Sequence, residues 1–380
     1  MLLLIKNANV YAPESLGMRD LLIGGGRILA IEEYIAPNSY VQQRWDAQGK
    51  ILTPGLIDQH MHILGAGGTR GFASMTPEVQ LSELIACGTT TVVGLLGTDG
   101  STRSIKSLYA KTKSLEMEGL SAYMLTSYFG IDPVTITHSI QEDMIFIDKV
   151  IGCKVAISDI RSSYPSDREL LRHLQQVRVG GQIASKKGIL HIHLGILESR
   201  MDILFRLVQE HHFPIEHISP THVGRTEALF EQSLEFAKLG GMIDITTGAS
   251  QYTKPWKSVM YALKQGIPLD RMTFSSDGNT GLSRFDEAGN RIGFRQAPID
   301  QNLAEVISLI QEGGLSISQA FSLITSNPAK NLGLPNKGRI VPGADADLCC
   351  FTDQWELTDV FAKGQHMMAD RRIIVKGSFE

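Results

Sequence analysis

Eight short apolar runs typical of buried strands recur through the middle of the chain, and stretches of helical periodicity separate them. The runs lie at 55–63, 89–97, 120–128, 152–158, 189–195, 216–224, 242–248 and 272–278. Several of the helical stretches, such as TEALFEQSLEFAKLGG, end in the glycine that is common after a helix C-terminus. Strands that alternate with helices form parallel sheets, and eight such units predict an α/β fold of the (β/α)8 TIM barrel class.

Both ends of the chain differ from this middle part. Residues 1–53 contain short apolar runs broken by turn signals, and the tail after residue 337 returns to short strands and tight turns. A barrel takes roughly 250 residues, so a chain of 380 residues has room for an appendage. We expect residues 1–53 and 337–380 to form one small β-sandwich domain, and residues 54–336 to form the barrel.

Charge balance and apolar patterning exclude several classes of function. With 36 Lys and Arg against 40 Asp and Glu and no basic cluster, the chain lacks the positive surface typical of nucleic-acid-binding proteins. No apolar run approaches the roughly 18 residues of a membrane span, and the MLLLIKNANV start has no signal-peptide cleavage site. We therefore expect a cytoplasmic protein with reduced cysteines, whose partner is a small-molecule substrate.

The first strand run, GLIDQHMHILG, contains two histidines at i and i+2. Because side chains two apart on a strand share one face, His60 and His62 can converge on a single metal ion. Taken alone the pattern is weak, since hydrogen-bonded structural histidines are more common than metal ligands. Residues on the other predicted strands are needed to distinguish metal ligands from structural histidines.

Other ionisable residues also fall near the C-terminal ends of the predicted strands, where a barrel of this class carries its active site. Lys154 lies among apolar residues of the fourth run, where an unpaired ammonium is costly to bury. Considered alone, Lys154 could extend its side chain so that the ammonium group reaches solvent at the barrel rim. The set directed at one cavity comprises His60, His62, Lys154, His193, His222 and Asp277.

Several similar residues fit structural roles better. His191 forms a second H-x-H with His193 but lies two residues deeper in the barrel, so we favour a core role for it. Asp99, Asp159 and Asp244 stand at strand ends, where a single aspartate is usually a helix cap or a loop hydrogen-bonding group. The remaining histidines are predicted to be solvated: His138, His173, His211, His212, His217 and His366.

The ordered set H-x-H, Lys, His, His and Asp on strands one, four, five, six and eight resembles the binuclear-metal amidohydrolase superfamily. Within it, the chain resembles the isoaspartyl (β-aspartyl) dipeptidases. The resemblance covers nearly the whole chain and rests on DQHMH, TPEVQLSELIACGTTTVVGLLGTD, IGCKVAISDIRS, PTHVGR, FEQSLEFAKLGGMIDIT and SSDGN.

This resemblance implies two Zn²⁺ ions per chain, although other divalent ions suit the same ligands. His60, His62 and Asp277 would hold one ion, and His193 and His222 the other. Lys154 would be carboxylated on Nζ, so that its carbamate bridges the ions. A hydroxide between the ions would attack the amide carbonyl while Asp277 acts as the proton shuttle. The family also implies a homo-oligomer.

Four residues match substrate-binding positions of the dipeptidases: Gly67, Thr98, Arg161 and Arg225. A guanidinium is suited to binding a substrate carboxylate. The predicted activity is therefore hydrolysis of the isopeptide bond of β-aspartyl dipeptides. Two alternatives remain open, namely an amidohydrolase for another carboxylate-bearing amide, either N-acylated or cyclic as in dihydroorotase, and a non-catalytic scaffold relative.

Three positions depart from the dipeptidase pattern. Thr69 stands where the family has the glutamate that holds the substrate α-ammonium group. Phe129 replaces a tyrosine that donates a hydrogen bond to the developing oxyanion, and Tyr128 lies one residue earlier, where a loop shift would be needed for it to serve. Gly281 replaces a substrate-binding serine. The metal ligands are thus complete, and part of the specificity pocket differs.

Overall fold

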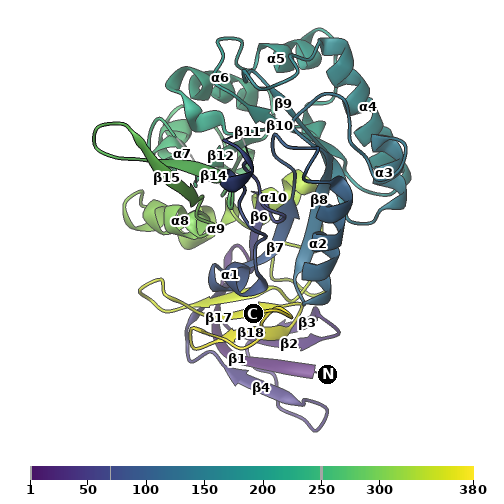
Figure 1. Cartoon of the computed structure of the whole chain (residues 1–380). Coiled ribbons are helices and arrows are strands. Elements are labelled where there is room, and N and C mark those ends of the chain that lie inside the picture. Colours follow the sequence, from purple (N-terminus) through teal and green to yellow (C-terminus); the bar gives the residue numbers. More distant parts are fainter. Residues whose placement is uncertain (1, 69, 249–250) are drawn as a thin grey trace.

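The computed structural model describes residues 2–68, 70–248 and 251–380. Two parts are distinct in Figure 1, a barrel surrounded by helices and a smaller sheet that contains both chain termini. No helix in the described ranges is both long enough and apolar enough to cross a membrane.

The barrel consists of parallel strands that pair with one another in chain order. Met61 and Gly278 form a parallel bridge that brings the last strand back to the first. Each predicted strand run overlaps one of these strands, so the predicted barrel is confirmed. The strands are β6 (Leu56–Met61), β7 (Thr89–Gly94), β8 (Ser121–Ser127), β9 (Val150–Ile157), β10 (Ile189–Leu194), β11 (Ile218–Thr221), β12 (Ile243–Thr246) and β13 (Met272–Ser275).

Helices cover the outside of the barrel, and their inward faces carry the periodic apolar residues. In α4, Leu170, Leu174 and Val177 are buried, while Ser166 caps the helix and Glu169 completes its capping box. The helices are α1 (Leu81–Ala86), α2 (Ile105–Met117), α3 (Ile140–Phe146), α4 (Asp167–Ile183), α5 (Asp202–Gln209), α6 (Glu227–Lys238), α7 (Pro255–Lys264), α8 (Gln301–Gln311), α9 (Ile317–Ser322) and α10 (Ser326–Leu332). Short 3₁₀ turns lie at Phe72–Ser74, Ile215–His217, Val223–Arg225 and Leu269–Arg271.

An antiparallel hairpin that the sequence did not predict follows the last barrel strand. It consists of β14 (Gly281–Phe285) and β15 (Arg291–Gln296) and projects from the body of the molecule in Figure 1. Both strands are largely exposed, so they lack the alternation of apolar and polar residues that reveals a half-buried strand.

The smaller sheet combines strands from both chain ends. Its members are β1 (Leu2–Tyr11), β2 (Ser15–Gly24), β3 (Arg27–Glu32), β4 (Gln43–Asp46), β5 (Ile51–Pro54), β16 (Leu348–Phe351), β17 (Leu357–Ala362), β18 (Gln365–Ala369) and β19 (Arg372–Ile373). The antiparallel pairing of β5 with β16 joins the two ends. β1 pairs with β2 on one edge and with β4 and β5 on the other, and the sheet packs around its own apolar core, which includes Ile5, Leu21 and Phe361.

Two histidines predicted to be solvated are buried, so that prediction was wrong for them. His173 lies three residues after Leu170 and four before Val177, which places it on the buried face of α4. His217 is buried near the start of β11, with Nδ1 2.7 Å from the carbonyl oxygen of Gly188. The helical spacing in the sequence could have predicted the burial of His173. The burial of His217 could not be predicted in this way, because its partner is distant along the chain.

Candidate metal centre and substrate pocket

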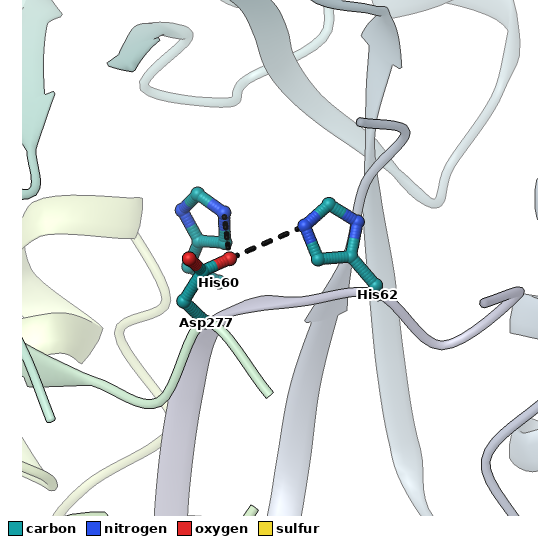
Figure 2. Close-up of side chains that lie close together, drawn as sticks. All are labelled: His60, His62 and Asp277. Atoms are coloured by element: carbon teal, nitrogen blue, oxygen red, sulfur yellow. Dashed lines mark ion pairs between the residues drawn. The ribbon is translucent and has the colours of Figure 1, made fainter. Parts of the chain in front are cut away.

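Three predicted ligands meet where β6 and β13 end. The Nε2 atoms of His60 and His62 lie 3.3 and 3.2 Å from the same oxygen of Asp277, Oδ1. Figure 2 shows both imidazoles directed at this carboxylate. One donor atom from each residue lies within 4.8 Å of the other two, an arrangement that can hold a metal ion.

The other three predicted ligands adjoin this group. Lys154 Nζ, on β9, is 3.4 Å from His60 Nε2. The ring of His222 is centred 4.8 Å from the ring of His60 and 4.6 Å from that of His193. All these side chains are buried, and the barrel brings together residues from six positions spread over more than half of the sequence.

The backbone is left-handed at two of these residues. Asp277 has φ 50° and His222 has φ 66°, values that L-residues other than asparagine and aspartate seldom adopt. Both residues come directly after or close to the end of a strand, where the left-handed turn redirects the chain. Such conformations cluster at functional sites because the surrounding fold must compensate for their cost.

The protonation states suit metal binding. Burial lowers the pKa of Lys154 to about 7 and that of His60 to about 3. Burial also lowers the pKa values of His193 and His222 well below their ordinary value. Burial alone would raise the pKa of Asp277, but the imidazoles of His222, His60 and His62 hold it well below its usual range. Neutral imidazoles and an anionic carboxylate are the forms that coordinate metal ions.

Each of three imidazoles uses one nitrogen for a partner outside the cluster. His60 Nδ1 lies 2.9 Å from His191 Nε2, His193 Nε2 lies 3.2 Å from Asp159 Oδ2, and His222 Nδ1 lies 2.6 Å from Thr246 Oγ1. The opposite nitrogen of His222, Nε2, is buried and has no hydrogen-bond partner among the described residues. An unpaired buried nitrogen is costly, so this residue set fits divalent cations better than an empty core.

A cavity of about 390 Å³ opens above the cluster. Every described residue predicted to contact substrate lines it except Tyr128, so Gly67, Thr98, Phe129, Arg161, Arg225 and Gly281 do so. Ile196 and Leu282 add apolar surface. Thr69 lies outside the described residues.

Of the two aromatic residues at the start of the loop after β8, one lines the cavity and the other does not. Phe129 lies inside the cavity, with its ring centred 4.6 Å from the ring of His193. Tyr128 packs against Gly100 and Gly130, where a β-carbon would clash with its ring, and is not among the residues lining the cavity. In this conformation the loop presents no hydroxyl group to the cavity.

Asp159 connects the arginines with the predicted ligands, a role that the sequence prediction missed. Its carboxylate accepts hydrogen bonds from Arg161 Nε (2.9 Å) and Nη2 (2.7 Å), and Arg225 Nη1 lies 3.9 Å from it. Although burial would raise its pKa, the bonds from Arg161 and His193 keep that pKa far below the usual range. The D-x-R spacing just after a strand was the available signal, but it does not reveal the contact with His193.

Comparison with known proteins finds relatives that cover most of the chain. The sequence model of the amidohydrolase family matches residues 51–368. The crystal structure of a β-aspartyl dipeptidase from Fervidobacterium islandicum AW-1, solved with the dipeptide β-Asp-Leu, is 41% identical, with 98% of each chain covered and a TM-score of 0.91. A dihydroorotase from Streptococcus pyogenes is 24% identical, covering 95% of this chain and 93% of that protein, and a D-hydantoinase from Rhizobium radiobacter is 22% identical, covering 93% and 87%.

Proposed function

The chain belongs to the amidohydrolase family and is a hydrolytic enzyme, and we propose that it cleaves the isopeptide bond of β-aspartyl dipeptides with the help of bound divalent metal. One observation carries the proposal: four imidazoles, an amine and a carboxylate converge under a cavity that also contains two guanidinium groups. A non-catalytic scaffold would not need such a convergence, because burying these groups without ligands is costly.

We propose two Zn²⁺ ions per chain, with His60, His62 and Asp277 holding one and His193 and His222 the other. Bound ions of this kind polarise an amide carbonyl and make hydroxide available near neutral pH. The buried amine of Lys154 would react with carbon dioxide, forming an N–C bond and losing a proton, to give an anionic carbamate beside both ions. A carbonyl signal from ¹³C-bicarbonate should be present in the native protein and missing in Lys154→Met.

Asp277 is the proposed proton carrier. Its carboxylate is anionic at neutral pH and lies at the floor of the cavity, next to both histidines of β6. It can therefore take the proton released when water attacks the amide carbon. Passing this proton to the amide nitrogen converts a poor leaving group into a neutral amine. The chain then releases a carboxylate and an amine.

Arg161 and Arg225 are the proposed carboxylate-binding groups. Asp159 engages Nε and Nη2 of Arg161 and so leaves Nη1 of that guanidinium for the substrate. Arg225 is largely buried at the wall of the cavity, where its charge is weakly screened. Phe129 and Gly281 carry no hydroxyl group, so the chain would bind the substrate with fewer hydrogen bonds than the dipeptidase pattern provides.

A cyclic or N-acylated amide is the second candidate substrate. Thr69 offers no negative charge for a substrate ammonium group, and the relatives named dihydroorotase and D-hydantoinase cover nearly all of the chain. The metal ligands and the arginines would also serve an N-acylated or cyclic amide that carries a carboxylate, because they interact with the amide and the carboxylates and not with the ammonium group.

A substrate comparison tests the proposal. The zinc-loaded protein is assayed for kcat/KM with β-Asp-Leu, succinyl-Leu, dihydroorotate and hydantoin, and Asp277→Asn serves as the blank. Dipeptidase activity is supported if the native protein hydrolyses β-Asp-Leu at a measurable rate and Asp277→Asn does not. Turnover of succinyl-Leu or of the cyclic amides without turnover of β-Asp-Leu would assign the chain to the second candidate.

A further inference from the structure

A set of buried polar side chains, which we call the polar column, extends from the metal cluster toward the opposite end of the barrel. It comprises His191, Ser219, Asn331, Gln59 and Asp244, each of which is 1% exposed. These residues belong to β10, β11, α10, β6 and β12, so five separate elements supply one chain of hydrogen bonds. The proposed mechanism uses none of them.

The column is continuous in its hydrogen bonds. Starting at the cluster, the distances are 2.9 Å from His60 Nδ1 to His191 Nε2, 3.2 Å from His191 Nδ1 to Ser219 Oγ, 3.0 Å from Ser219 Oγ to Asn331 Nδ2, 2.9 Å from Asn331 Nδ2 to Gln59 Oε1, and 2.6 Å from Gln59 Nε2 to Asp244 Oδ1. The Asp244 carboxylate also accepts hydrogen bonds from Thr221, Thr273 and Ser275.

The direction of these bonds can be assigned from the Asp244 end as far as Ser219. A carboxylate only accepts, so the Gln59 amide must turn its NH₂ group toward Asp244 and its oxygen toward Asn331. Asn331 Nδ2 then donates one hydrogen to Gln59 and the other to Ser219 Oγ. Ser219 therefore accepts from Asn331 and has a second lone pair that can accept the Nδ1–H of His191. Its own hydroxyl hydrogen allows the opposite direction as well, so the His60 end has to select between the two.

The His60 end of the column imposes a matching condition. Its Nε2 faces Asp277 and Lys154, so a metal ion in the cluster needs the lone pair of that nitrogen. The ring hydrogen must then sit on Nδ1, which faces His191 Nε2. His191 can accept this hydrogen only if its own hydrogen is on Nδ1 and directed at Ser219, which is the direction that the column permits.

We propose that His191 is a positioning residue that holds His60 in the Nδ1-protonated tautomer and thereby presents Nε2 to the metal. This inference rests on the proposed role of His60 as a ligand. Metal-binding histidines usually donate their second nitrogen to a carboxylate, a carbonyl or water. A histidine in this place fixes the tautomer without adding another negative charge next to Asp277.

Metal affinity in His191 variants tests the proposal. His191→Phe removes the acceptor, whereas His191→Gln retains an amide oxygen near the position of Nε2. Zinc dissociation constants are measured on chelator-stripped protein by competition with a chromophoric chelator, and thermal unfolding of the metal-free variants is followed in parallel. His173→Phe is the matched control, because it removes a buried histidine on α4 that is outside the column.

We expect His191→Phe to raise the dissociation constant of one of the two zinc ions by about 10–100-fold. This is the range for residues that hydrogen-bond to metal ligands. His191→Gln should recover most of this loss, and His173→Phe should bind zinc as the native protein does. Native-like affinity in His191→Phe, or equal losses in the Phe and Gln variants, would overturn the proposal. A native protein that binds no zinc would instead refute the proposed function.

A second measurement observes the tautomers in the native protein. Imidazole ¹⁵N shifts of the zinc-loaded protein report which ring nitrogen carries hydrogen, and His60→Gln and His191→Gln assign the two rings. The proposal requires hydrogen on Nδ1 of both His60 and His191. Hydrogen on Nε2 of His191 in the native protein would contradict it.

Discussion

Asp277 combines two properties that a residue seldom has together, a left-handed backbone and a buried anionic side chain held between two imidazoles. We predict that Asp277→Asn lowers kcat by about 10²–10⁴-fold, because the amide cannot accept the proton. KM should change little, because the arginines that bind carboxylates are untouched. Steady-state kinetics with β-Asp-Leu checks this, with exposed Asp353→Asn as control. Near-native turnover in Asp277→Asn would mean that another residue carries the proton.

Thr69 gives a second prediction at this scale, derived from the sequence. A charge-assisted hydrogen bond to an ammonium group contributes roughly 1.5–3 kcal/mol, or about one to two powers of ten in affinity. Thr69→Glu should therefore raise kcat/KM for β-Asp-Leu relative to succinyl-Leu by about that factor. Thr69→Gln introduces a side chain of the same size as glutamate but without its charge, so it should not raise this ratio. A strong native preference for β-Asp-Leu that Thr69→Glu leaves unchanged would mean that a different acid binds the ammonium group.

Individual residues differ in how far the sequence could predict them. The convergence of the six predicted ligands follows from strand ends and order, because a barrel brings the C-terminal ends of its strands to one face. The contacts of Asp159 and His191 depend on side chains from other strands, so spacing alone indicated only a loop aspartate and a core histidine. The orientation of Tyr128 depends on two glycines in separate loops, which strand periodicity does not reveal.

Among the elements, those with a buried face could be predicted and those without one could not. The barrel strands are apolar along their length, and helices such as α4 carry periodic apolar residues. The β14–β15 hairpin is exposed on both strands and so left no such pattern, although Gly281 and Leu282 from it line the cavity. An element can therefore contribute to the site and still escape pattern-based prediction.

The contact between the tail segment before β16 and the start of β8 depends on one buried lysine. Lys337 Nζ lies 2.7 Å from Asp345 Oδ2, pairs with Asp347 and donates a hydrogen bond to Ser121, the first residue of β8. Lys337→Met would take the ion-pair partner from the buried Asp347 carboxylate, which keeps a hydrogen bond from the Lys363 backbone, and breaking a buried ion pair costs about 3–5 kcal/mol. We predict a large fall in the denaturation midpoint, with little change in kcat of the folded protein, because this contact lies at the barrel end opposite the cavity.

The exposed ion pair of Lys330 with Asp270 provides the control for that experiment. Its atoms are 2.7 Å apart, but the side chains are 55% and 50% exposed. Such a pair contributes about 0–1 kcal/mol, so Lys330→Met should change the midpoint only slightly. Equal effects of the two lysine substitutions would show that burial of Lys337 has no energetic consequence.

In the whole molecule, the smaller sheet and the cavity lie at opposite ends of the barrel. The smaller sheet contacts the N-terminal ends of β6 and β7, where Cys349 Sγ lies 3.2 Å from the carbonyl oxygen of Gly88 and Gly55 donates to the carbonyl of Asp347. The metal cluster and the cavity lie at the C-terminal ends of the strands. The smaller sheet can therefore join both chain ends without obstructing the cavity.

We also predict that the chain forms a homo-oligomer. Large apolar side chains are exposed on the loops that surround the cavity, among them Phe72, Ile160 and Ile196. Apolar surface exposed to solvent in this way is removed from water when chains associate. Light scattering should give a multiple of the 41.7 kDa chain mass. A single-chain mass at micromolar concentration would contradict the prediction.

The central claim is that six convergent residues assemble a two-ion centre that the hydrolytic reaction requires. Its most direct test is a titration of Zn²⁺ into chelator-stripped protein, with bound zinc and the initial rate of β-Asp-Leu hydrolysis measured at each addition. The account predicts no activity without metal and saturation of the rate at about two bound ions per chain. Hydrolysis by the stripped protein, or saturation at one ion or fewer, would contradict it.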